Sequence, residues 1–352
     1  MSHRILLTGA SGYLGGTLLA RWTSVNLPPY ERLYALVRTE EQAKSVGQYA
    51  AAPEPLIFDI KDEKAVRSAV VDNRITIVYF LVDAFQVDSQ RYFIAALAQV
   101  KKVTGIDVHF LHTSGAKIFS SHAGAPIDRP LLDTEEELYD IQKAQVPLIP
   151  PTQTAINTNN TVIEDATALG VKSYIFVPCI VYGKGEGFGN RISIQTVAIV
   201  RAAQATRQML SVDPGRPTWP VCHVLDNTAL YLELLRSILA NENPGEGQQG
   251  YYLAASGSVA WVDLYAAMAT SLAKRGIIDN DSVAPASDKA LGDMATALGC
   301  TKELVALQLG GMCTFTAKHG SDIGWTPKYA ASHILDTADE EVELILAESA
   351  SS

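Results

Sequence analysis

Residues 5–16 read ILLTGASGYLGG, in which a short apolar run leads into glycines at positions 9, 12 and 15. A segment with helical spacing of its apolar residues, Thr17–Trp22, follows at once.

The three glycines have separate roles in a loop that connects a strand to a helix. The first glycine permits a tight turn, the second lets a pyrophosphate approach the backbone, and the third lets the helix pack closely on the strand. The helix start adds free N–H donors and the positive end of the helix dipole. Between a strand and a helix, this glycine pattern predicts a dinucleotide-binding loop, and a glycine-rich connection without a ligand is the alternative. The loop residues predicted to contact the dinucleotide are Gly9, Ser11, Gly12, Tyr13, Leu14 and Gly15.

Apolar runs of strand length alternate with amphipathic segments through the first half of the chain. The runs are Leu33–Val37, Leu56–Phe58, Ile75–Val82, Val108–Leu111 and Ser173–Val177. This alternation predicts an α/β fold of the Rossmann type, a doubly wound parallel sheet with helices on both faces. The glycine-rich and polar character after Gly183 predicts a smaller C-terminal substrate-binding domain. We expect the dinucleotide-binding domain at residues 1–182 plus about 223–254, and the smaller domain at about 183–222 and 255–340.

The composition of the chain limits which binding partners and which cellular compartment we expect. The formal net charge is −10, which would repel nucleic acids and anionic membranes, so neither is expected as a partner. The four cysteines are scattered with no metal-ligand spacing, which favours reduced thiols and no metal site. No apolar run approaches the ~20 residues that span a bilayer, and the first residues lack a signal-peptide pattern. We expect a cytoplasmic protein that acts on a small molecule. A homodimer is compatible with the sequence, which does not fix the oligomeric state.

The residue at the end of the second predicted strand selects the dinucleotide. An acidic residue there would bind the ribose hydroxyls of NAD, but the chain has Arg38. A guanidinium pairs well with a 2′-phosphate, so NADP is the predicted cofactor, with a solvated surface arginine as the alternative. At the next two strand ends, we expect Asp59 and Ile60 to border the adenine, and Leu81 and Val82 to pass beneath the ribose.

Several motifs together resemble one family. They are TGASGYLGG at 8–16, ALVR at 35–38, FDI at 58–60, FLHTSG at 110–115, VPCIVYG at 177–183, CHVLDN at 222–227 and IGWTP at 323–327. Nearly the whole chain resembles extended or atypical short-chain dehydrogenases/reductases of the NAD-dependent epimerase/dehydratase superfamily, especially fungal members. The resemblance implies a small C-terminal substrate domain and a cleft at the carboxyl ends of the strands. It places Thr113 and Pro178 beside the cofactor.

The catalytic residues match the family only in part. The resemblance implies a hydroxyl that orients the carbonyl, a tyrosine that acts as acid or base, and a lysine that lowers the pKa of the tyrosine. Ser114 matches the hydroxyl position, although a turn residue at a strand end is the alternative. At the positions of the tyrosine and lysine the chain has Pro151 and Ala155. We expect a helix from about Thr152 to Leu169, after an irregular, proline-punctuated stretch at Ser120–Pro151. A Tyr-x-x-x-Lys sequence does occur in that stretch, at Tyr139 and Lys143, either as a displaced catalytic pair or as an ordinary surface turn.

Residues after the glycine-rich stretch KGEGFG are candidates for the substrate site. Asn190 and Arg191 could bind a polar or acidic group, with a capping role as the alternative. The predicted function is an NADP(H)-dependent oxidoreductase that reduces a carbonyl or imine of a small metabolite. Two alternatives remain open: a non-redox NADP-binding relative that acts as a sensor or as an isomerase or cyclase scaffold, and a sugar-nucleotide-type epimerase or dehydratase.

Overall fold

A seven-stranded parallel sheet forms the centre of the molecule, in a computed structural model that describes residues 2–351. The strand order is β11-β7-β5-β4-β1-β2-β3, and every adjacent pair is parallel. The strands are β1 (Arg4–Leu7), β2 (Arg32–Val37), β3 (Glu54–Ile57), β4 (Ile77–Phe80), β5 (His109–Thr113), β7 (Lys172–Pro178) and β11 (Tyr251–Ala254). The order reverses direction between β1 and β4, so this is the predicted doubly wound Rossmann fold. Ligands of such sheets bind outside the strands' carboxyl ends at that reversal.

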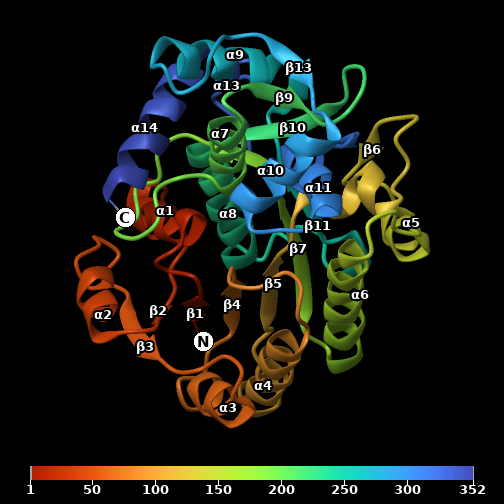
Figure 1. Cartoon of the computed structure of the whole chain (residues 1–352). Helices are drawn as coiled ribbons and strands as arrows, with labels where there is room; N and C mark the ends of the chain where they lie inside the picture. The colour runs from red at the N-terminus through yellow and green to blue at the C-terminus, as the bar shows by residue number, and fades with distance from the viewer. Residues whose placement is uncertain (1, 352) are drawn as a thin grey trace.

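Helices cover both faces of this sheet, as the alternating sequence predicts (Figure 1). One face packs against α3 (Glu63–Asp72), α4 (Asp88–Thr104) and α6 (Pro151–Leu169). The other packs against α1 (Tyr13–Arg21), α2 (Glu40–Val46) and α8 (Val224–Leu239). The sheet and these helices bury two separate apolar clusters, one for each face. Apart from the largely exposed edge strand β3, the strands of this sheet are buried on both faces, which explains their near-continuous apolar sequences.

The remaining segments form a smaller, mixed part above the large sheet in Figure 1. Its strands are β8 (Ile180–Tyr182), β10 (Thr218–His223) and β12 (Gly257–Ala260) in one small sheet, and the pairs β9 (Met209–Ser211) with β13 (Val283–Pro285) and β6 (Leu131–Leu132) with β14 (Phe315–Thr316). Its helices are α7 (Ile194–Thr206), α9 (Trp261–Lys274), α10 (Asp288–Leu298), α11 (Val305–Leu309), α13 (His333–Asp336) and α14 (Ala338–Ser351), while α12 (His319–Asp322) packs against β11 of the large sheet. The chain returns to the large sheet at β11, after α8 has packed against α1.

The segment before α6 contains a short helix, α5 (Leu138–Ala144), where the sequence indicated an irregular, proline-punctuated stretch. α5 packs against α6, which begins at Pro151. A proline in the first helical turn costs no hydrogen bond, because that N–H would have no partner within the helix. The start of α6 therefore lies where the sequence places it, and α5 is a separate element beside it.

Candidate cofactor cleft and active site

One cavity of about 1120 Å³ lies at the carboxyl ends of the central strands, under the smaller part of the molecule. The loops after β1, β2, β3, β4, β5 and β7 all contribute to its wall. The predicted cofactor residues that line it are Gly9, Ser11, Gly12, Tyr13, Leu14, Gly15, Arg38, Asp59, Ile60, Leu81, Val82 and Pro178. Trp219 and Leu307 line it from the smaller part. The cavity thus runs from the β2 and β3 ends to the β5 and β7 ends.

The loop between β1 and α1 has a backbone that only glycine accommodates. Gly9 has a φ of +71°, and an added Cβ would lie 2.9 Å from the carbonyl oxygen of Leu81. A Cβ on Gly15 would lie 2.3 Å from the Gly9 oxygen, so the helix start and the strand end touch backbone to backbone. Gly12 caps α1 without a side-chain hydrogen bond, which leaves the first N–H groups of the helix to a ligand. These residues fit the pyrophosphate of a dinucleotide.

A second glycine-rich loop, residues 183–189, is fixed onto the first. Tyr13 donates its hydroxyl to the Gly183 oxygen (2.6 Å), and the Asn190 N–H donates to the Ser11 oxygen (3.0 Å). A Cβ on Gly189 would lie 2.2 Å from that same Ser11 oxygen. Glycine is therefore required here for close approach, and the loop forms part of the cavity wall beside the cofactor loop.

The two substrate candidates of this loop lie differently. Asn190 lines the cavity, although its side chain also accepts from the Ile192 N–H and donates to the Ile192 oxygen, both at 3.1 Å. Arg191 is not among the lining residues, and its Nε donates to the Gly187 oxygen (3.1 Å). The loop folds back on itself, so the Arg191 side chain braces the loop where we expected a substrate contact.

At the β2 end of the cavity, Arg38 is exposed and its guanidinium has no ion pair among residues 2–351. Its backbone N–H donates to Oε1 of Gln42, which also lines the cavity (2.9 Å). Asp59, at the β3 end, accepts from the Lys61 N–H (2.9 Å). Arg38 is the one cationic side chain at this end of the described lining, and an arginine of this kind can pair with a phosphate.

At the β5 end, Ser114 and Thr113 face opposite sides, as successive strand residues do. The Ser114 hydroxyl is buried, lines the cavity and has no hydrogen-bond partner. The Thr113 hydroxyl bonds to the hydroxyl of Tyr231 in α8 (2.8 Å) and does not line the cavity. The Thr113 side chain therefore contacts α8 and not the cavity, where we expected it to contact the cofactor. An unpaired buried hydroxyl beside a cavity, such as Ser114, is available to a ligand.

Tyr139 and Lys143 lie outside the cavity, on α5. The Tyr139 hydroxyl donates to Oε1 of Glu164 in α6 (2.6 Å), and the Lys143 ammonium lies 2.7 Å from the same oxygen. The hydrogen bond from Lys143 lowers the pKa of Glu164, while burial raises the pKa of Tyr139. These three groups satisfy one another at the α5–α6 contact. The expectation of a displaced catalytic pair is not supported by this placement, and we assign the pair no catalytic role.

The first turns of α6 present Thr152 and Ala155 to the cavity, and neither can serve as the family's tyrosine or lysine. A residue that the sequence analysis missed, Lys117, lines the cavity close to Ser114 in sequence, on a short 3-10 helix at Ala116–Phe119. Burial lowers the pKa of Lys117 to about 8. The available signal was a lone charged residue within the apolar stretch AKIF.

Other candidates have structural partners. Cys179 lines the cavity, but its thiol donates to the Ala254 oxygen (3.0 Å) and burial raises its pKa well above the ordinary value, so it is no nucleophile. Asp226 is buried and accepts from the N–H groups of Lys328 and Tyr329.

Within residues 2–351, no three His, Cys, Asp or Glu side chains come close enough to hold a metal ion. No helix in that range has both the length and the apolar character needed to cross a membrane.

The sequence matches the NAD dependent epimerase/dehydratase family over residues 5–246, so the chain belongs to that family. The chain is also 23% identical, over 310 aligned residues, to the protein oxidase ucsJ of an Acremonium species. The aligned region covers 80% of this chain and 82% of that protein.

Solved structures of the family have the same fold. A UDP-glucose 4-epimerase from Thermotoga maritima aligns with a TM-score of 0.62 at 16% identity, over 97% of this chain and 99% of that one. A dTDP-glucose 4,6-dehydratase from Bacillus anthracis, solved in complex with NAD, aligns with a TM-score of 0.64 at 13% identity, over 97% of each chain. At such identities the likeness extends to the fold alone. The family and the cavity together support an enzyme that binds a nicotinamide dinucleotide.

Proposed function

We propose that this protein is an NADP(H)-dependent oxidoreductase that reduces a carbonyl or imine of a small, partly apolar metabolite. The observation that carries the proposal is the pairing of two free polar groups at opposite ends of one cavity. Arg38 lies at the β2 end without an ion pair, and the Ser114 hydroxyl lies at the β5 end without a hydrogen bond. When bound, NADPH supplies a hydride from its nicotinamide.

The residues of the chain would bind and orient the reactants. The Gly9–Gly15 loop and the start of α1 would hold the pyrophosphate, and Arg38 would pair with the 2′-phosphate. The Ser114 hydroxyl would donate a hydrogen bond to the substrate oxygen and fix its orientation. Trp219 and Leu307 give the substrate end an apolar wall, which favours a substrate with an apolar portion.

Calorimetry and turnover test this proposal together. NADPH is expected to bind at least 10-fold more tightly than NADH, because only NADPH offers Arg38 a phosphate. NADPH should then be consumed in step with the reduction of phenanthrenequinone, an uncharged apolar dicarbonyl. Equal binding of the two cofactors would contradict the NADP assignment. NADPH binding without consumption, across a panel of ketones, aldehydes and cyclic imines, would contradict the reductase assignment.

The non-redox alternative has one specific observation in its favour. The α6 positions of the family's tyrosine and lysine hold Pro151 and Ala155, and Tyr139 and Lys143 do not reach the cavity. A protein of this kind would bind NADP(H) and act as a sensor, or as a scaffold for isomerisation or cyclisation. Stoichiometric NADPH oxidation that disappears in Ser114→Ala would exclude it. An epimerase or dehydratase acting on sugar nucleotides ranks below both, since it too requires an acid or base at those α6 positions.

A further inference from the structure

Lys117 is the charged side chain of the substrate end of the cavity. Three charged residues are found in the described lining, Arg38, Asp59 and Lys117. The first two lie at the ends of β2 and β3, whereas Lys117 follows β5 and shares its end of the cavity with Ser114 and Thr152. Its position therefore associates Lys117 with the reacting end of a bound substrate rather than with the adenosine of the cofactor.

The Lys117 ammonium has no hydrogen bond or ion pair within residues 2–351. Some partly exposed lysines have such partners, since Lys143 pairs with Glu164 and Lys172 with Asp107, and the ammonium groups that lack one elsewhere are not desolvated as Lys117 is. Lys117 is partly buried beside the cavity, and an ammonium that has lost much of its water without gaining an anion is less stable in its charged form. A cost of this kind is retained at functional sites more often than in structural cores.

The elements packed against Lys117 bring it no negative charge. Burial lowers the pKa of His112 to about 4 and raises the pKa of Cys313 to about 12, so both are neutral near pH 7. The α6 residues from Pro151 to Ile163 include no charged side chain. Desolvation alone therefore acts on Lys117 and lowers its pKa to about 8. The titratable groups on the surrounding elements include His112 on β5, His122 after the 3-10 helix, Cys179 after β7 and Cys313 before β14. The charge of Asp83, after β4, acts on His112 but not on Lys117.

We propose that Lys117 is the catalytic acid that donates a proton to the substrate oxygen. The inference rests on the proposed reductase function, and it assigns to the 3-10 helix after β5 the task that the resemblance places on α6. The carbonyl carbon receives the hydride that the nicotinamide supplies, and the π pair of the C=O bond forms an O–H bond with the proton of Nζ. Lys117 becomes a neutral amine and takes a proton from solvent, while Ser114 orients the oxygen. An ammonium that loses its proton just above neutral pH suits this task.

Competitive labelling of the intact protein tests the acidity of Lys117 without any substrate. Acetic anhydride is applied between pH 6 and pH 11, and the modified lysines are quantified by mass spectrometry, with the exposed Lys102 as an internal reference. We expect the reactivity of Lys117 to rise with a midpoint near pH 8. A midpoint at the ordinary lysine value of about 10.4, or no reaction at any pH, would overturn the proposal.

Turnover of phenanthrenequinone then separates proton donation from charge attraction. Lys117→Arg keeps the positive charge but cannot release a proton at these pH values, and Lys117→Met removes both properties. Both variants should lose about 100-fold or more in kcat while their Kd for NADPH stays within twofold of wild type. The fall in wild-type kcat as the pH rises through 8 should be absent from both. Lys102→Met, an exposed change on α4, is the matched control and should keep full turnover.

Failures of the two proposals are distinguishable. If Lys117→Arg retains kcat and Lys117→Met changes only KM, Lys117 attracts the substrate and the acid role is wrong, while the reductase function stands. If the wild type binds NADPH but does not oxidise it with any of the carbonyl or imine compounds, the reductase function is wrong and the acid role falls with it, whatever pKa the labelling gives. Retained NADPH binding shows that a variant is folded, so a loss of kcat is not a loss of structure.

Discussion

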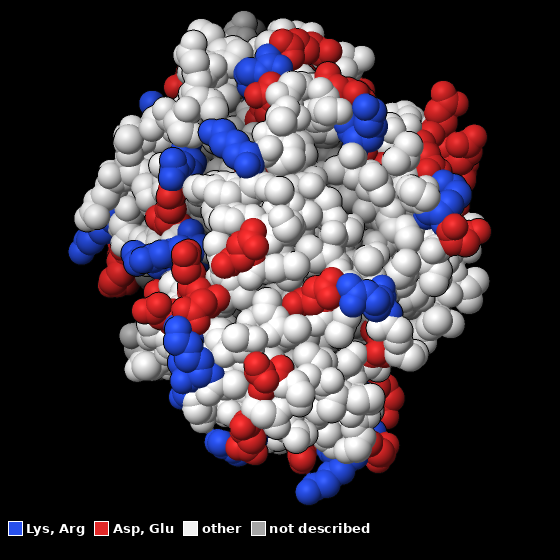
Figure 2. Space-filling model, turned by 90° about the horizontal axis from the view of Figure 1, so that it is seen from above, with Lys and Arg blue, Asp and Glu red and all other residues white. Residues whose placement is uncertain are grey.

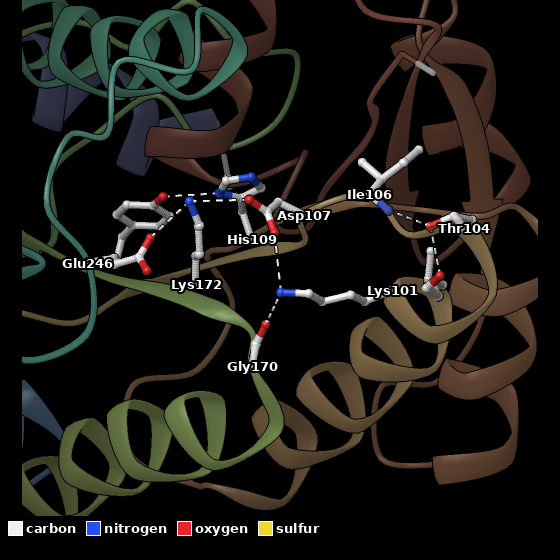
Figure 3. Close-up of polar contacts among 10 residues, drawn as sticks. Lys101, Thr104, Ile106, Asp107, His109, Gly170, Lys172 and Glu246 are labelled. Atoms are coloured by element: carbon white, nitrogen blue, oxygen red, sulfur yellow. Dashed lines mark hydrogen bonds and ion pairs between the residues drawn. The ribbon is translucent and has the colours of Figure 1, made fainter.

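Charged side chains are paired at the amino ends of the central strands, whereas several charged or polar side chains at the carboxyl ends have no partner within the described residues. At the amino ends of β5 and β7, Asp107 lies 3.2 Å from the Lys101 ammonium and 3.4 Å from that of Lys172 (Figure 3). Lys101 also donates to the Gly170 oxygen (2.8 Å), and Lys172 lies 3.5 Å from Glu246. Each of these side chains therefore has at least one partner within the chain, and together they join α4, β5, α6 and β7.

At the carboxyl ends of the central strands, three polar side chains lie beside the cavity without partners. The Ser114 hydroxyl, the Lys117 ammonium and the Arg38 guanidinium have no side-chain hydrogen bond or ion pair in the described part of the chain. A few buried hydroxyls away from the cavity, such as those of Ser173 and Ser237, also lack partners, but only the free groups beside the cavity are available to a ligand. By this criterion Tyr139, Lys143 and Glu164 belong with the structural groups, although the first two match a catalytic spacing.

The face of the molecule that is seen from above in Figure 2 shows no large patch of charge of one sign. Seen from above, charged side chains lie singly or in small groups of mixed sign within a broad uncharged surface (Figure 2). The surface ion pairs are partly exposed and contribute little each. The free polar groups of the cavity are thus the informative ones, and the changes below test them in order of expected effect.

The largest effect is expected from Gly15→Ala. The new Cβ would lie 2.3 Å from the Gly9 oxygen, a backbone atom that cannot move without opening the contact between β1 and α1. We expect the free energy of unfolding to fall by about 3 kcal/mol and NADPH binding to disappear at micromolar cofactor, as measured by denaturant titration and calorimetry. Gly292→Ala, in α10 with open space around it, is the control and should stabilise by about 0.5–1 kcal/mol. Unchanged NADPH affinity in Gly15→Ala would contradict the assigned role of the loop.

Ser114→Ala should lower kcat for phenanthrenequinone by about 100-fold, because a hydrogen bond to the substrate oxygen is lost at the reacting end. The Kd for NADPH should not change, since the Ser114 hydroxyl lies at the substrate end. Tyr139→Phe is the contrasting variant: it removes the hydroxyl bonded to Glu164 and should leave kcat within twofold. If Tyr139→Phe were the damaging change and Ser114→Ala the silent one, the distinction between free and paired groups would fail.

Arg38→Ala should raise the Kd for NADPH by about 10- to 100-fold and leave the Kd for NADH unchanged, because one charge-assisted pair with the 2′-phosphate is lost. Both constants come from calorimetry on the same protein sample. Arg32→Ala, at the start of β2, removes an arginine that already pairs with Glu54 and provides the matched control. An equal loss of affinity for both cofactors would mean that Arg38 supports the loop rather than the phosphate.

The sequence predicts those features of the site that depend on neighbours along the chain. The β1 loop, Arg38 and Asp59 follow strands directly, so a correct strand assignment places their side chains at the carboxyl edge of the sheet. Thr113 could not be assigned in this way, because its hydroxyl is directed by Tyr231, which lies 118 residues later. Arg191 turns back to its own loop, which also depends on contacts that no local pattern reveals.

Lys117 was missed for a different reason. The resemblance directs attention to a tyrosine and a lysine on α6, and in their absence to the nearest literal match at Tyr139 and Lys143. Whether a lysine is free or paired depends on what lies opposite in space, and Glu164 lies opposite Lys143 while no carboxylate partners Lys117. Spacing within a sequence carries no information on that difference.

The smallest effect is expected at the paired end of the sheet, from Asp107→Asn. The hydrogen bond from Lys101 lowers the pKa of Asp107 below its ordinary value, so its ionised form is favoured in the folded protein. A depressed pKa contributes stability that is present above the unfolded value and is lost as the pH falls through the folded one. Because the Asp107 side chain is 51% exposed, the contribution should be less than about 1 kcal/mol at pH 7.

Urea unfolding of wild type and Asp107→Asn at several pH values measures this contribution. The two proteins should differ at pH 7, and the difference should shrink as the pH falls from about 4 through the lowered pKa of the folded Asp107 carboxyl. Added salt should also reduce the difference, since the pair is partly exposed to solvent. NADPH affinity should be the same in both, because Asp107 lies at the amino ends of the strands and the cavity lies at their carboxyl ends. A change in NADPH affinity would show that the two ends of the sheet are coupled, which their separate sets of partners do not predict.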